Sequence, residues 1–193
     1  MDDQKIFQIL QGWFPPLEQR EIPKKKHRHT FQQFLAWMAA EKVANHFQAY
    51  LMSVDAENPH ENGLERCAVL QHMNIDMGLT QQQIRKRTTP LYEHYKKHKE
   101  VIGKYYNVNA QAFDIVIEEI FTFLESKNLE LLIIYADTAH WMAVPNEDVK
   151  IHKFCKAFSK QFKDEILQLQ DKRQHRIEHW PELTMLHLYC YFL

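Results

Sequence analysis

The sequence has little glycine. Its only glycines are Gly12, Gly63, Gly78 and Gly103, which is few for 193 residues. Glycine lets a backbone turn tightly or approach a phosphate closely, so its scarcity favours helices. The sequence also lacks a Gly-rich phosphate loop, a G-x-S-x-G elbow and an H-E-x-x-H motif. It therefore meets none of the common signatures of nucleotide binding, acyl transfer or zinc proteolysis.

Cysteine is also scarce, and long apolar runs are absent. Cys67, Cys155 and Cys190 lie far apart and never form a C-x-x-C pair. Neither a disulfide framework nor a cysteine zinc site is predicted. The longest apolar run, residues 131–136, is about a third of the roughly 20 residues that a membrane-spanning helix needs. The acidic N-terminus does not resemble a signal peptide. We expect a soluble, cytoplasmic protein without a membrane partner.

The composition is that of an ordinary globular protein. Hydrophobic residues make up 45% of the chain and charged residues 25%, which is too apolar for intrinsic disorder. The length fits one domain with a sizeable core. We therefore predict a single globular domain over residues 1–193, in which residues 15–29 form a Pro-rich, basic linker after a short N-terminal helix.

Apolar spacing predicts an α+β fold dominated by helices. Short runs on both sides of a polar turn indicate a β-hairpin at 131–135 and 140–144, to which 184–192 could add a third strand. Helices are expected at 3–14, from Thr30 to about residue 51, at 64–73, from Pro90 to about residue 106, after Asn109, and from 145 to about residue 180. The expected fold is a mainly α-helical domain of six or seven helices, with a two- or three-stranded antiparallel sheet in the C-terminal third.

Charge is unevenly distributed, although the net charge is only −1. Residues 24–28 carry +4, and residues 85–104 carry seven lysines or arginines against two glutamates, or +5. Residues 110–148 hold one lysine against eight acidic residues, or −7, and residues 150–176 return to +5. Such blocks indicate basic and acidic faces suited to binding, or solvated helices whose charges pair within the molecule.

Two basic segments are candidates for nucleic-acid binding, because lysine and arginine neutralise phosphates. Tyrosines follow the second segment, at 92, 95, 105 and 106. The near-neutral pI of 6.9 and the acidic block favour the alternative of a basic linker and a solvated helix face. The candidate residues are Lys24, Lys25, Lys26, Arg28, Arg85, Lys86 and Arg87.

Two short motifs near the C-terminus suggest chemistry. His175, Glu178 and His179 match the H-x-x-E-H order, which resembles that of inverzincins and implies two zinc ligands and a glutamate that activates water. The alternative to a zinc site is that these residues form the solvated end of a helix that stops before Pro181. Arg173 and His179 have a spacing that resembles HEPN-type helical ribonucleases, in which the pair engages the RNA phosphate and 2′-hydroxyl. Four of the seven arginines show this spacing, so it discriminates little.

We therefore expect no metal and no cofactor, and the candidate metal and catalytic residues stay alternatives. The favoured function is that of a non-catalytic intracellular protein that binds another protein through oppositely charged faces, as an adaptor, a regulator or a toxin-neutralising protein. The alternative is a nucleic-acid-directed protein, either a basic-patch binder or a HEPN-like ribonuclease.

Overall fold

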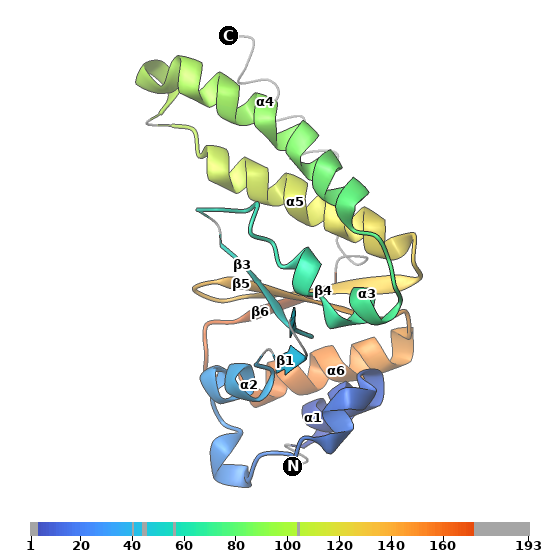
Figure 1. Cartoon of the computed structure of the whole chain (residues 1–193). Helices are drawn as coiled ribbons and strands as arrows, with labels where there is room; N and C mark the ends of the chain where they lie inside the picture. Colours follow the sequence, from blue (N-terminus) through green and yellow to red (C-terminus); the bar gives the residue numbers. More distant parts are fainter. Residues whose placement is uncertain (1–3, 40, 44–45, 56, 104, 172–193) are drawn as a thin grey trace.

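A four-stranded sheet lies between two layers of helices in the computed structural model (Figure 1). The structure describes residues 4–39, 41–43, 46–55, 57–103 and 105–171. One helical layer contains α1, α2 and α6, and the other contains the α4–α5 hairpin (Figure 1). The α-helices are α1 (Lys5–Trp13), α2 (Phe31–Trp37), α3 (Ala68–His72), α4 (Gly78–Ile102), α5 (Val108–Glu125) and α6 (Asp148–Gln161). Short 3₁₀ helices lie at Pro15–Gln19, Lys25–His27 and Leu64–Arg66.

The sheet is antiparallel, in the order β3-β5-β4-β6. Its strands are β3 (Met52–Val54), β4 (Leu129–Tyr135), β5 (Ala139–Pro145) and β6 (Gln168–Asp171), while β1 (Glu41–Val43) and β2 (His46–Gln48) form a separate pair. The predicted α+β class and the predicted hairpin, β4–β5, are confirmed. The sheet has four strands rather than two or three, because β3 comes from the N-terminal third and β6 follows α6.

Alternation along β4 explains its unbroken apolar run. Leu132 and Ile134 pack in a cluster with residues of α1, α2 and α6. Leu131 and Ile133 pack in a second cluster with residues of α3, α4 and α5. Successive side chains of a strand point to opposite faces, so a strand covered by helices on both faces must be apolar at every inward position.

The helix predicted from Thr30 to about residue 51 is wrong beyond its first two turns. Thr30 does cap α2, accepting a hydrogen bond from the backbone of Gln33, but α2 ends at Trp37 and strands follow. The guanidinium of Arg20 donates hydrogen bonds to the carbonyl oxygens of Trp37 and Ala39. In a longer helix these oxygens would instead accept hydrogen bonds from backbone N–H groups four residues later. This contact comes from a residue 17 positions before Trp37, so local spacing does not predict it.

Three other boundaries differ from the prediction. Pro90 lies inside α4 rather than at a helix start, which the exposed surface at this point permits because water can satisfy the carbonyl that lacks a partner. Asn107, not Asn109, caps α5. The helix predicted to reach residue 180 ends at Gln161 and gives way to β6. The strand predicted at 184–192 lies outside the described residues.

Candidate functional site

The second half of α4 extends past the sheet (Figure 1). The buried residues of α4 are Thr80, Ile84 and Thr88, so its burial ends near the middle of the helix. From there, α4 lies against the first turns of α5 and the loop before them. A helix segment that buries little of its own surface is available for contacts with another molecule.

A groove of about 650 Å³ lies at this end of the α4–α5 hairpin. We call it the tyrosine groove, because Tyr92, Tyr95, Tyr105 and Tyr106 line it, together with Glu57 and Asn109. Tyr105 is 91% exposed, and Val101 on the last turn of α4 is 75% exposed. Tyrosine is enriched at protein interfaces because it offers a large rigid ring with a polar end.

A chain of hydrogen bonds orders one wall of the tyrosine groove. The Tyr92 hydroxyl donates to Asn109 Oδ1 over 3.2 Å, and Asn109 Nδ2 donates to Glu57 Oε2 over 2.9 Å. Burial and the nearby Glu57 carboxylate raise the pKa of Tyr92. Glu57 is the charged side chain among the described residues that line the groove. The groove therefore presents aromatic rings beside one carboxylate.

Two of the remaining tyrosine rings lie close together. The rings of Tyr95 and Tyr106 lie 6.1 Å apart at an angle of 33°, and the Tyr106 hydroxyl donates to Gln111 Oε1 over 2.5 Å. Ring separations of this size are favourable contacts. Tyr95 and Tyr106 are half-buried, so the groove combines fixed rings with the exposed Tyr105.

His60 lies behind Tyr92, with their rings 5.8 Å apart, and its Nε2 lies 3.5 Å from Thr88 Oγ1. Burial lowers the pKa of His60, and the positive charge of Arg85 lowers it further. Both effects disfavour the positively charged form of the imidazole next to the groove.

The basic segment of α4 is partly neutralised within the molecule. Arg85 and Lys86 are exposed, but Arg87 forms ion pairs with Glu118 and Glu119 of α5 over 2.7 and 2.6 Å. The basic block and the acidic block of the sequence are thus neighbours. Arg87, predicted as a nucleic-acid contact, is used to join the two helices.

The other basic segment lies on the opposite side of the sheet, in the layer of α1, α2 and α6 and next to α2 (Figure 1). Gln161 Nε2 of α6 donates to the carbonyl oxygen of Arg28 over 2.7 Å, and the backbone N–H of Phe31 donates to Glu165 Oε1 over 2.7 Å. Arg28 is only 6% exposed and donates to the carbonyl of Pro23. Lys24, Lys25 and Lys26 are exposed. The two predicted basic segments therefore do not combine into one surface.

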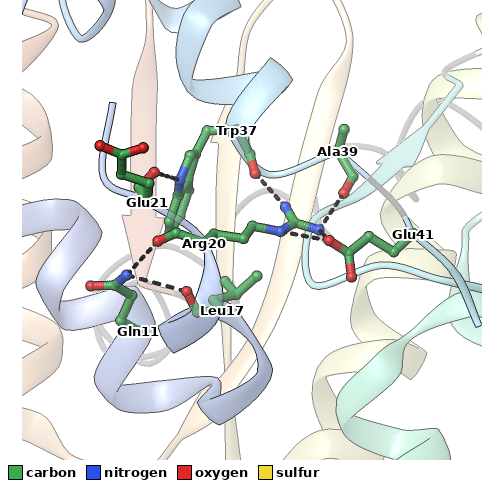
Figure 2. A network of polar contacts seen from close by, with 7 residues as sticks. All are labelled: Gln11, Leu17, Arg20, Glu21, Trp37, Ala39 and Glu41. Atoms are coloured by element: carbon green, nitrogen blue, oxygen red, sulfur yellow. Dashed lines mark hydrogen bonds and ion pairs between the residues drawn. The ribbon is translucent and has the colours of Figure 1, made fainter. Parts of the chain in front are cut away.

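A polar network around Arg20 fixes the chain before this basic segment (Figure 2). Gln11 Nε2 donates to the carbonyl oxygens of Leu17 and Arg20, over 3.2 and 2.8 Å. Arg20 Nε donates to Glu41 Oε1 over 2.8 Å, and Trp37 Nε1 donates to the Glu21 carbonyl over 3.2 Å. The predicted linker at 15–29 is thus tied to both α1 and α2.

The C-terminal motif residues cannot be compared with this geometry. Arg173, His175, Glu178 and His179 lie outside the described residues. Within the described part of the chain, no three His, Cys, Asp or Glu side chains are grouped as metal ligands. None of the described helices is both long and apolar enough to cross a membrane.

The tyrosines were noted in the sequence only beside the basic segment considered for nucleic-acid binding, and Glu57, Asn107 and Asn109 were not expected to join them in a groove. The asparagines could have been found from the helix start that was predicted at this point of the sequence. No sequence pattern indicates Glu57, because only the folding of a loop brings it next to α5. The lysines of α6 were counted only as part of a charge block, although their helical spacing would have placed them on one face.

Comparisons with protein-family models, curated proteins and solved structures found no match to this chain.

Proposed function

We propose that the chain is a non-catalytic, cytoplasmic protein that binds another protein, as an adaptor, a regulator or a toxin-neutralising protein, and that the tyrosine groove is its docking site. The observation that carries this proposal is the group of four tyrosines at the free end of the α4–α5 hairpin, one of them 91% exposed. Exposed aromatic surface of this kind marks protein interaction sites.

The chemistry of the groove favours a partner that inserts a cationic side chain. Tyrosine rings attract a cation over their faces, and Glu57 supplies a full negative charge at the same surface. The amide of Asn109 holds the carboxylate in place through a 2.9 Å hydrogen bond. An arginine or lysine of the partner, flanked by an apolar residue that covers Val101 and Tyr105, fits this arrangement. The opposite charges expected at the interface are then Glu57 and the partner's cation.

The same features disfavour a nucleic acid in the tyrosine groove. A phosphate would meet the Glu57 carboxylate, and Arg87 is already paired with Glu118 and Glu119. Residues 91–104 still carry +2, with four lysines against Glu93 and Glu100, but none of the described residues that line the groove is a lysine or an arginine. Since binding to a nucleic-acid backbone depends on positive charge at the contact itself, a protein partner is the better fit.

A titration with small peptides tests the proposal directly. The probes are acetyl-Phe-Arg-amide and acetyl-Phe-Glu-amide, and the readout is the NMR signals of the tyrosine rings. We expect the arginine peptide to shift the signals of Tyr95, Tyr105 and Tyr106, and the glutamate peptide to leave them in place. Glu57→Gln keeps the hydrogen bond to Asn109 but removes the charge, and should weaken binding roughly fivefold or more, as loss of a charged partner does.

The matched control is Glu61→Gln, an exposed glutamate in the same loop that does not line the groove. It should bind the arginine peptide as the unaltered chain does. Equal shifts with both peptides, or equal loss of binding with Glu57→Gln and Glu61→Gln, would show that the groove does not select a cation.

A further inference from the structure

The exposed side of α6 carries a row of lysines opposite its buried face. Ile151, Phe154 and Phe158 point into the core, whereas Lys153, Lys156, Lys160 and Lys163 are all exposed. At 3.6 residues per turn, Lys153 and Lys160 fall on one line along α6 and Lys156 lies roughly 60° away from it, while Lys163 follows two residues after the helix ends. Three lysines thus share the exposed side of α6, and a fourth follows its C-terminal end.

Three more exposed lysines, at 24–26, come shortly before Arg28 in the chain, and the carbonyl oxygen of Arg28 accepts a hydrogen bond from Gln161 at the C-terminal end of α6. No acidic residue occurs in 22–31 or in 151–163. Among the described residues, none of these lysines takes part in an ion pair. We define the lysine surface as Lys24, Lys25, Lys26, Lys153, Lys156, Lys160 and Lys163.

The geometry points to the lysine surface as a binding site for the phosphate backbone of duplex DNA, independent of base sequence. Lysine is a point charge on a flexible stem, which neutralises a phosphate without the planar fork that reads a base edge. No Phe, Tyr or Trp is exposed in residues 24–29 or 148–163, so the rings on which unpaired bases usually stack are missing there, which disfavours single strands. This site is separate from the tyrosine groove and does not rest on the proposed protein docking.

The helical setting of Lys153, Lys156 and Lys160 favours DNA over duplex RNA. The major groove of B-form DNA is wide enough to admit an α-helix, whereas the A-form groove of RNA is narrow and deep. Lys153 and Lys160 are separated by roughly 10 Å along the helix, which corresponds to about three base steps at roughly 3.4 Å each.

The test is binding of the full chain to a fluorescent 20-base-pair DNA of mixed sequence, measured at several salt concentrations. We expect affinity to fall steeply with salt, because each neutralised phosphate releases a counterion. Lys156→Gln with Lys160→Gln removes two of the three lysines on the exposed side of α6. It should reduce the slope of log affinity against log salt by about two and weaken binding at 0.1 M salt by roughly fifty-fold.

The matched control is Lys96→Gln with Lys97→Gln, which removes two exposed lysines of α4 from the opposite layer and should leave DNA affinity unchanged. A second DNA of different sequence should bind equally. The inference is overturned if the α4 and α6 variants weaken binding alike, if duplex or single-stranded RNA binds more tightly, or if vesicles of anionic lipid bind while DNA does not.

Discussion

Asn62 is the residue through which the loop before α3 is joined to both the sheet and α4. It is fully buried. Its side-chain oxygen accepts from the backbone of Leu64 over 3.1 Å, and its amide exchanges two hydrogen bonds with Gln81 over 3.2 and 3.3 Å. Its carbonyl accepts from Trp141 Nε1 over 2.7 Å. One small residue thus connects three parts of the fold.

Asn62→Ala should therefore lower the free energy of unfolding by about 2 to 4 kcal/mol, because it leaves the Gln81 amide and the Leu64 N–H without partners. Urea denaturation of the full chain measures this loss. The control is Asn58→Ala in the same loop, an exposed site that should change stability little. A similar loss for both variants would mean that the Asn62 hydrogen bonds do not carry the effect.

His140 gives the protein a pH-dependent stability. It is half-buried on β5, with its ring edge-on to Phe31 at 5.7 Å, and burial lowers its pKa from the usual 6.5. As the pH falls, the unfolded chain takes up a proton at this residue before the folded chain does, so the stability present above about pH 6.5 is progressively lost below it. His60, whose pKa is also lowered, acts in the same direction.

We expect the free energy of unfolding to fall between pH 7 and pH 5.5, and His140→Gln to make this fall smaller. Urea denaturation at the two pH values measures both quantities. His152→Gln, on the exposed side of α6, is the matched control, and an equal effect of both variants would show that the burial of His140 is not the cause. A stability that rises toward pH 5.5 would contradict the assignment.

Helices and strands were predictable where their causes are local. The β4–β5 hairpin follows from two short apolar runs on either side of a polar turn, and the start of α2 follows from Thr30. The end of α2 was not predictable, since Arg20 terminates it from a distant position. The tyrosines of the groove were visible in the sequence, whereas Glu57 joined them only through tertiary packing.

Substitution of Arg20 tests how α2 is terminated, because Arg20 caps this helix and holds the segment that leads to Lys24 (Figure 2). Arg20→Gln should lower the free energy of unfolding by about 1 to 3 kcal/mol, since it removes charge-assisted hydrogen bonds from a mostly buried site. Hydrogen exchange should become faster in residues 20–39. The control Arg66→Gln, at an exposed arginine, should change neither quantity.

In the whole molecule, the sheet separates the two candidate binding surfaces. The tyrosine groove lies on the α4–α5 layer and the lysine surface on the layer of α1, α2 and α6 (Figure 1). Glu57→Gln should therefore affect protein binding alone, and the α6 lysine variant DNA binding alone. Distant sites without shared partners are expected to act additively.

The most direct measurement of the central claim is photocrosslinking from the tyrosine groove. A photoreactive phenylalanine analogue replaces Tyr105 in the full chain, and crosslinked products are mapped by mass spectrometry with and without Glu57→Gln. We expect crosslinks to a protein segment that contains an arginine or lysine beside an apolar residue, with the yield reduced by Glu57→Gln and unchanged by Glu61→Gln. Crosslinks to nucleic acid, or protein crosslinks that are indifferent to Glu57, would contradict the central claim.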